Sequence, residues 1–232
     1  YSLHQGEPYH ISSISYDFRD RFLEPIILSD TVNTLLHRGN IFDISVLEAE
    51  RERIALYLKD RGYYNFSVNN IEYRVDTLQG NRTVNIRMIV KRNITGYDER
   101  GRAIMDDSRI YRLTEINVMP DYDPAIERAE QNRRMLDTIF YRGLNIVSEG
   151  QPNVRPAVLH SAIPLTPNTT YNASLVDRTY NDIMSLGYFK SARIAFEELP
   201  RGQNDSLVVN YAGDGRDSYS PKKFEDIREG YL

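Results

Sequence analysis

The sequence predicts an α+β fold in which two units follow one another, each with the order strand–helix–helix–strand–strand. The first observation is a pattern that occurs twice: a long helical stretch ends at a glycine and two aromatic residues follow, as Gly62-Tyr63-Tyr64 and as Gly187-Tyr188-Phe189. The second is that apolar and polar residues alternate after each pattern, which is typical of half-buried strands. The third is size, because 232 residues are enough for two small domains.

The composition excludes several functional classes. The chain has no Cys, so disulfides, thiolate nucleophiles and Cys-ligated metal sites are ruled out. It carries 29 Lys and Arg against 33 Asp and Glu, which argues against nucleic-acid binding. It has neither a Gly-x-Ser-x-Gly motif nor a glycine-rich phosphate-binding loop, and none of its four His lies at helical spacing from another. We therefore expect no enzyme activity, no catalytic residue, no metal site and no cofactor.

The first unit is predicted from its long helix outward. Ser45 and Glu48 have capping-box spacing, and apolar residues then recur on one helical face until Gly62 ends the helix. The other elements expected here are a strand over 9–18, a short helix over 30–37 and strands over 63–75 and 83–90. Within the strand over 63–75 the alternation changes phase after Val68, which suggests a β-bulge.

The second unit repeats this order, with Ser174 and Asp177 as a weaker capping pair and Gly187 as the helix end. An insertion over 120–152 separates its first strand from its short helix. The other elements expected are strands over 110–119, 192–196 and 207–211, a short helix over 154–162 and, inside the insertion, a helix over 123–137 and a strand over 138–147.

These elements predict a domain organisation. We expect one domain over 1–95, a linker over 96–107, a second domain over 108–212 and a flexible tail over 213–232.

The repeated pattern resembles a known family, the polypeptide-transport-associated (POTRA) domains. Both glycine–aromatic–aromatic patterns carry the resemblance, and its most specific stretch runs from Ile163-Pro-Leu-Thr-Pro through Tyr171 to Thr179-Tyr-Asn-Asp-Ile-Met-Ser-Leu-Gly-Tyr-Phe189. This stretch is similar to the POTRA region of outer-membrane assembly proteins of the BamA/TamA type. The resemblance covers residues 9–211. It implies that each unit is a three-stranded mixed sheet with two helices on one face.

The resemblance also implies a location and partners. POTRA domains lie in the periplasm of Gram-negative bacteria, precede a barrel in the outer membrane and catalyse nothing. The implied partners are unfolded outer-membrane proteins, accessory lipoproteins and the protein's own C-terminal barrel, through which it would associate with the membrane. Since the chain has neither an initiator Met nor a signal peptide, we expect it to be a piece of a longer protein.

If the family's sheet order holds, the binding sites lie on edge strands, because unpaired N–H and C=O groups can add an extended segment of another chain. The candidate residues are Phe66, Ser67, Val68, Asn69 and Asn70 in the first unit and Ala192, Arg193, Ile194, Ala195 and Phe196 in the second. Their polar members could equally form a solvated face that protects an open edge. By contrast, the residues expected to mark the fold by packing between helix and sheet are Gly62, Tyr63, Tyr64, Gly187, Tyr188 and Phe189.

Three alternatives stay open. The chain could be a structural spacer or docking module for the barrel, or the POTRA region of a two-partner secretion or lipid-transport barrel. It could also be a small periplasmic enzyme, which would need a pocket with a perturbed titratable group. Separately, Asp-Ser/Thr-apolar triplets that resemble the O-glycosylation sequence of some Gram-negative bacteria occur at Thr31, Thr77, Thr138 and Ser206.

Overall fold

The computed structural model describes residues 7–78, 81–121, 136–199 and 206–214. The chain divides into two compact units, the first made of Tyr1–Lys59 and Asn65–Arg109 and the second of Asp60–Tyr64 and Ile110–Leu232. The short segment that follows the long helix of the first unit therefore belongs to the second. No helix among the described residues is both long enough and apolar enough to cross a membrane.

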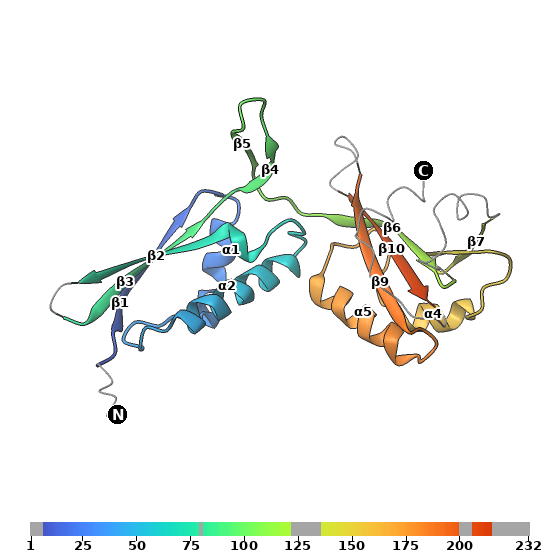
Figure 1. Cartoon of the computed structure of the whole chain (residues 1–232), viewed down its shortest axis with the longest axis horizontal. Coiled ribbons are helices and arrows are strands. Elements are labelled where there is room, and N and C mark those ends of the chain that lie inside the picture. The colour runs from blue at the N-terminus through green and yellow to red at the C-terminus, as the bar shows by residue number, and fades with distance from the viewer. Residues whose placement is uncertain (1–6, 79–80, 122–135, 200–205, 215–232) are drawn as a thin grey trace, which may run out of the picture. The chain divides into compact units, whose positions relative to one another are not determined.

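The first unit contains a three-stranded mixed sheet with helices on one side (Figure 1). Its strands lie in the order β1-β3-β2, with β1 parallel and β2 antiparallel to β3. The elements are β1 (His10–Phe18), α1 (Glu24–Ser29), α2 (Ile44–Lys59), β2 (Ile71–Leu78) and β3 (Thr83–Val90), with the 3-10 turns η1 (Thr31–Asn33) and η2 (Val68–Asn70). This arrangement confirms the predicted fold class.

Helix α2 shows the predicted buried face but a different cap. Leu47, Ile54 and Leu58 are buried, as their spacing on one face predicts. At the N-terminus the side chain of Asp43, rather than that of Ser45, accepts a hydrogen bond, from the Ser45 N–H at 2.8 Å. Hydrogen bonds from Ser45 lower the pKa of Asp43.

Two predicted elements of the first unit are wrong. Helix α1 lies before the predicted range 30–37, and Pro25 stands in its first turn, where a missing N–H costs nothing. The strand predicted over 63–75 begins only at Ile71. The change of phase after Val68 marks the turn η2 and not a bulge.

The first unit ends in a two-stranded hairpin of β4 (Asn93–Tyr97) and β5 (Ala103–Asp106). Most of the stretch predicted as a linker over 96–107 lies in this hairpin. The division between the compact units falls after it, between Arg109 and Ile110.

The second unit has a five-stranded sheet in the order β7-β8-β6-β10-β9. Within it, β6, β10 and β9 repeat the topology of the first sheet, because β6 is parallel and β9 antiparallel to β10. The elements are β6 (Arg112–Met119), β7 (Asp137–Tyr141), β8 (Leu144–Ser148), α4 (Pro156–Ala162), α5 (Ala173–Ser185), β9 (Ser191–Glu198) and β10 (Ser206–Asp214).

The second sheet is therefore larger than the three strands predicted. The stretch predicted as one strand over 138–147 folds into two, because Arg142 and Gly143 both have positive φ and form the turn of a hairpin. This hairpin comes from the insertion over 120–152 and extends the sheet beyond β6. The predicted helix over 123–137 falls almost entirely outside the described residues. Of the predicted tail, β10 includes the start up to Asp214, and 215–232 lie outside the described residues.

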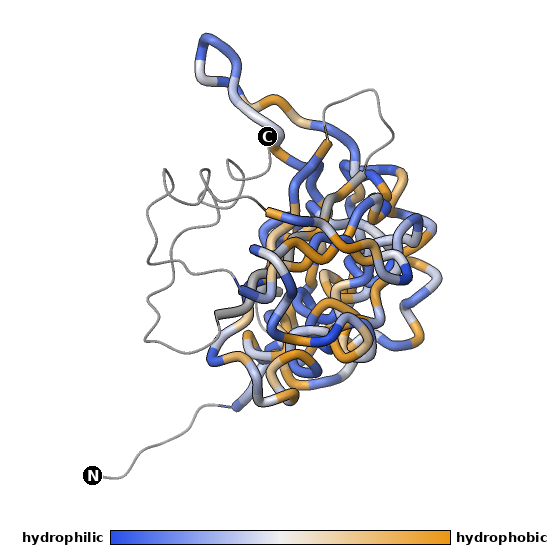
Figure 2. Tube along the Cα trace, turned by 90° about the vertical axis from the view of Figure 1, so that its right-hand side faces the viewer, coloured by the Kyte–Doolittle hydropathy of each residue, from blue (hydrophilic) through white to orange (hydrophobic). Residues whose placement is uncertain are grey.

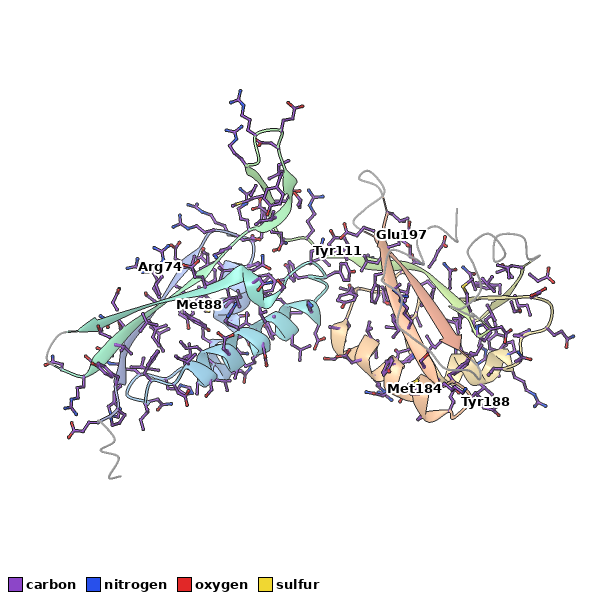
Figure 3. The ribbon with its side chains drawn as sticks, viewed as in Figure 1. Arg74, Met88, Tyr111, Met184, Tyr188 and Glu197 are labelled. Atoms are coloured by element: carbon purple, nitrogen blue, oxygen red, sulfur yellow. The ribbon has the colours of Figure 1, made fainter. Side chains whose placement is uncertain are left out.

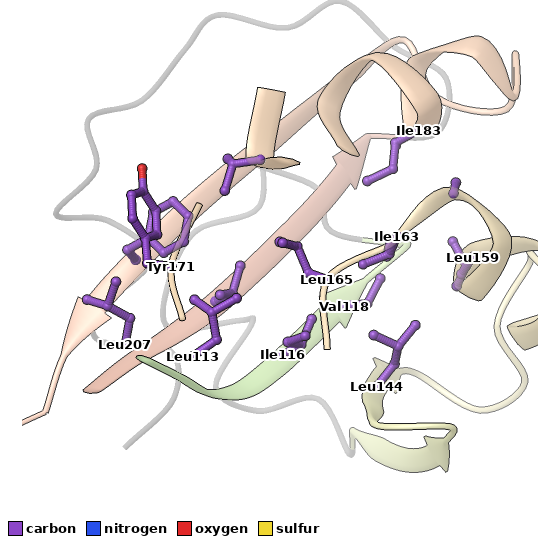
Figure 4. Packing of buried hydrophobic residues seen from close by; sticks show 14 of the residues in the cluster. Leu113, Ile116, Val118, Leu144, Leu159, Ile163, Leu165, Tyr171, Ile183 and Leu207 are labelled. Atoms are coloured by element: carbon purple, nitrogen blue, oxygen red, sulfur yellow. The ribbon is translucent and has the colours of Figure 1, made fainter. Parts of the chain in front are cut away.

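The core of each unit lies between its sheet and its helices. In the second unit Leu113 and Ile116 on β6 pack with Leu159 of α4 and Ile183 of α5 (Figure 4). Along the trace, hydrophobic positions alternate with hydrophilic ones (Figure 2). The result in the first unit is two distinct sheet faces: Met88 points toward α2, and Arg74 projects on the other side (Figure 3).

The two glycine–aromatic–aromatic patterns fold differently. Gly62 and Gly187 both have positive φ, at +97° and +70°. Tyr63 and Phe189 are buried. The prediction for Tyr188 is wrong, because its side chain is 62% exposed just after the C-terminal end of α5 (Figure 3).

Candidate functional site

An open groove of about 570 Å³ runs between α2 and the edge strand β2. Its apolar part comes from both elements and from the residues just before α2, and charged side chains surround it. The lining residues are Phe42, Ile44, Leu47, Glu48, Arg51, Asn69, Ile71, Glu72, Tyr73, Val75 and Lys91. The groove therefore follows one edge of the first sheet.

The backbone of β2 presents hydrogen-bonding groups on this side. The N–H of Lys91 donates to the carbonyl of Asn70 at 2.7 Å, which sets the phase of the ladder between β2 and β3. In an antiparallel pair, hydrogen-bonded and non-hydrogen-bonded positions alternate. The residues that bond to β3 are therefore Glu72, Arg74 and Asp76. Those whose N–H and C=O groups point away from β3 are Ile71, Tyr73 and Val75, and of these the N–H of Ile71 donates to the carbonyl of Val68 in the turn η2.

The same alternation places side chains. Because successive side chains of a strand point to opposite faces, Ile71, Tyr73 and Val75 share the face toward α2 and line the groove. Glu72 and Arg74 project on the outer face, where a salt bridge joins them. The residues that carry the outward-pointing backbone groups are thus the residues whose side chains form the apolar wall.

Salt bridges lie on both sides of the groove, one on α2 and one beside the sheet. On α2, Arg51 contacts Glu48 at 2.8 Å and donates to the carbonyl of Val68 at 2.8 Å, which attaches η2 to the helix. On the sheet, Lys91 lies 2.7 Å from Glu72, and this contact is the main reason why the pKa of Glu72 is lowered.

Tyr73 lies at the centre of the groove wall. Within the described residues its hydroxyl is buried and has no hydrogen-bond partner. Burial is the largest cause that raises the pKa of this phenol, and the nearby carboxylate of Glu50 raises it further. Both effects favour the neutral phenol, and the ring of Tyr73 contributes apolar area to the groove wall.

The candidate residues of the first unit lie beside this groove and not on a strand. Phe66 is buried, Ser67 caps the turn η2, and Val68, Asn69 and Asn70 form that turn. Asn69 alone among them lines the groove. The expectation that these five residues form the edge strand is wrong, because the buried Asn70 accepts hydrogen bonds from the N–H and hydroxyl of Ser67 and so closes a turn.

The candidate residues of the second unit do lie on an edge strand. The strand β9, which among the described strands pairs with β10 alone, contains Ala192, Arg193, Ile194, Ala195 and Phe196. At the opposite edge of the three strands β6, β10 and β9, the inserted strand β8 pairs with β6. It leaves β9 at the edge.

Sequence reasoning missed the main residues of the groove. The alternation of Ile71, Tyr73 and Val75 was visible and correctly indicated a strand. The contribution of α2 was not, because Ile44 and Arg51 lie outside the buried stripe of that helix. In the described part of the chain, no three or more His, Asp or Glu side chains gather where they could hold a metal ion.

Comparisons with known proteins agree with this fold. The POTRA family model, described as surface antigen variable number repeat, matches residues 5–93. The crystal structure of BamA POTRA3-5 from Haemophilus influenzae superposes with a TM-score of 0.53 at 16% identity, covering 89% of this chain and 61% of that one. The structure of BamA from Haemophilus ducreyi lacking POTRA domains 1-3 gives 0.58 at 15% identity, covering 90% of this chain and 30% of that one.

No curated protein matches the chain. The chain spans 61% of the first of these solved structures and 30% of the second, so it corresponds to part of them. The family match covers the sheet, the helices and the groove of the first unit, and the second unit repeats the same three-strand core. The first unit therefore matches the POTRA family model, and the chain as a whole has the fold of the POTRA domains in these structures.

Proposed function

We propose that this chain is the periplasmic POTRA region of an outer-membrane barrel protein, and that it binds extended segments of unfolded outer-membrane proteins at the edge of β2. One observation carries the proposal. Ile71, Tyr73 and Val75 line the groove, and Tyr73 and Val75 offer their N–H and C=O groups at the edge, whereas the N–H of Ile71 donates to the carbonyl of Val68. A bound segment can therefore gain backbone hydrogen bonds and side-chain burial at the same place.

The geometry selects a pattern in the bound segment. A strand added to β2 has every second side chain on the groove side, against Leu47, Tyr73 and Val75. The remaining side chains lie on the outer face beside Glu72 and Arg74. Segments that alternate apolar and polar residues fit both environments. Strands of outer-membrane barrels alternate in this way, because one face contacts lipid and the other the barrel interior.

Backbone pairing also explains how one surface can accept many clients, meaning the polypeptides that it binds. Main-chain hydrogen bonds demand no particular side chain, so they give affinity without sequence specificity. The apolar wall adds to this affinity because a bound segment buries apolar surface against it, which contributes roughly 25 cal/mol per Å². The proposal assigns no catalytic step to the chain.

The experiment removes one outward-pointing N–H. Val75→Pro deletes a donor that faces away from β3, so the ladder between β2 and β3 keeps its hydrogen bonds. The probe is a fluorescent eight-residue peptide, the length of β2, with valine alternating with threonine and lysine. We expect the full chain to bind it and the proline variant to lose about tenfold in affinity, since one lost hydrogen bond and a disturbed strand cost about 1.4 kcal/mol.

The matched control is Val75→Ala, which keeps the N–H and loses most of the side chain. It separates the backbone contribution from the apolar contribution, and circular dichroism verifies that both variants are folded. Equal affinity of Val75→Pro and Val75→Ala would contradict strand addition. If the unaltered chain does not bind the alternating peptide, the role as a structural spacer for the barrel is favoured instead.

The edge strand β9 is the second place where this proposal applies. Ala192 and Ile194 contact the core of the second unit, so a strand added beside β9 extends an existing packed sheet. A proline in 192–196, at a position whose N–H points away from β10, tests it. A cellular assay of outer-membrane protein assembly should then show a defect, and an unchanged assembly rate would restrict client binding to β2. Accessory lipoproteins are the other partners proposed for this strand.

A further inference from the structure

The hairpin of β4 and β5 carries several large apolar side chains that are exposed. Ile94, Tyr97, Ile104 and Met105 are between 47% and 68% exposed. Ile94 and Met105 are cross-strand partners, so they lie side by side. Within the described residues the hairpin is a two-stranded sheet of its own, and Figure 1 shows it projecting from the end of β3. A polar hairpin would be expected at such a position if it were only a connection.

The hairpin is nevertheless firmly attached at its base. The side chain of Asn70 donates to that of Asn93 at 2.8 Å, and Asn93 donates to the hydroxyl of Ser108 at 3.2 Å. The N–H of Ser108 donates to the carboxylate of Asp20, which is fully buried, at 2.7 Å. A buried network whose members satisfy one another holds its elements in one arrangement. The exposed apolar side chains therefore project from a fixed base.

This base adjoins the groove. Asn70 ends the turn that leads into β2, and the preceding residue, Asn69, lines the groove. Lys91, which directly follows β3, lines the groove too, and β4 begins two residues later at Asn93. The Ile71 end of the groove and the base of the hairpin are thus one continuous region of the first unit.

We propose that the hairpin extends the client-binding surface, so that a client segment longer than β2 continues past the Ile71 end of the groove onto Ile94 and Met105. This inference rests on the proposed function and deepens it. The favoured client is an extended segment with apolar residues at alternate positions over more than the length of β2. At about 3.3 Å per residue, β2 accommodates eight residues, and β4 adds the length of five.

The experiment compares two alternating peptides of the same pattern, one of eight residues and one of 13 residues, which matches β2 and β4 together. Both are titrated against the full chain and against the variants Ile94→Ser and Met105→Ser. We expect the long peptide to bind the unaltered chain about tenfold more tightly. Each hairpin variant should lose most of this gain and leave the affinity for the short peptide unchanged.

Val32→Ser is the matched control, because Val32 is an 83% exposed apolar residue of the same unit on the turn η1. It should change neither affinity. Equal binding of both peptides, or a gain that survives both hairpin substitutions, would overturn the role of the hairpin and leave binding at β2 intact. If neither peptide binds the unaltered chain, the proposed function fails, and the inference fails with it. A long peptide with its apolar residues in one block controls for non-specific adhesion.

Discussion

Gly62 lies so close to Thr170 that a Cβ atom on the glycine would stand 2.6 Å from the threonine Cγ2. Ile110 limits the same space from a second direction, at 2.7 Å. The carbonyl of Gly62 accepts a hydrogen bond from the N–H of Tyr111 at 2.8 Å, so the backbone cannot move aside without losing it. Both the positive φ and the close approach therefore require glycine here.

We expect Gly62→Ala to destabilise the second unit by about 2 kcal/mol or more, because the left-handed backbone alone costs a residue with a Cβ roughly 1–2 kcal/mol. Gly187→Ala is the matched control, since Gly187 has a similar φ but no atom within 4 Å of the added Cβ. Urea unfolding followed by tyrosine fluorescence measures both. Equal losses would show that the contact with Thr170 is unimportant.

The buried carboxylate of Glu50 gives the second prediction. It accepts hydrogen bonds from the Thr34 hydroxyl at 2.8 Å, from the Leu35 N–H at 2.9 Å and from the Arg53 guanidinium at 2.9 Å. Hydrogen bonds from the guanidinium to Glu50 are the largest cause that raises the pKa of Arg53.

We expect Glu50→Gln to destabilise the first unit by about 3 kcal/mol, because the amide cannot accept all these bonds and Arg53 loses a buried partner. The free energy of unfolding measures it. Glu52→Gln on the exposed side of α2 should stay within about 0.5 kcal/mol of the unaltered chain. A loss below about 1 kcal/mol for Glu50→Gln would mean that water replaces the missing contacts.

The third prediction concerns the base of the hairpin. Asn93→Ala removes the link between Asn70 and Ser108 and leaves buried polar groups without a partner. We expect faster amide hydrogen exchange across β4 and β5, by about tenfold, and little change in β1 and β3. Glu99→Gln at the exposed tip should not change the exchange. Uniformly faster exchange throughout the first unit would instead indicate a loss of global stability.

The fourth prediction is a pH dependence at the hairpin tip. The N–H of Arg102 and then its guanidinium donate to Asp98, at 2.8 and 2.7 Å, and these bonds lower the pKa of that carboxyl. A lowered pKa means that the contribution of Asp98 is present above its unfolded pKa of about 3.9 and is lost as the pH falls through the lower folded value. The amide signal of Arg102 should therefore shift only in acid, and Asp98→Asn should abolish this transition.

The sequence alone correctly predicted those elements in which the spacing of apolar residues matches the face that is buried in the fold. The strand over 83–90 is correct to the residue. It pairs with β1 on one side and with β2 on the other, and the apolar side chains that alternate along it are buried. The short helix was misplaced, since a helix of six residues has little periodicity, and the cap at Asp43 depends on a backbone turn that no spacing rule reveals. The groove was not predictable, because it requires knowing that Arg51 attaches η2 to α2.

The two extra strands of the second sheet, β7 and β8, were not predicted for a different reason. The stretch 138–147 has apolar residues on both sides of Arg142 and Gly143, so its composition does not show where the chain reverses. Only the positive φ at both residues distinguishes one long strand from a hairpin.

The alternation along β2 also divides the strand into two kinds of position for molecular evolution. At Arg74 and Asp76, which do not line the groove, mutation can change surface charge and solubility without altering the binding edge. At Ile71, Tyr73 and Val75 a change affects the wall of the groove, while the peptide groups that pair with a client under the proposed function persist in every residue except proline. Under the proposed function, a lineage can thus change one half of the strand and keep the same clients.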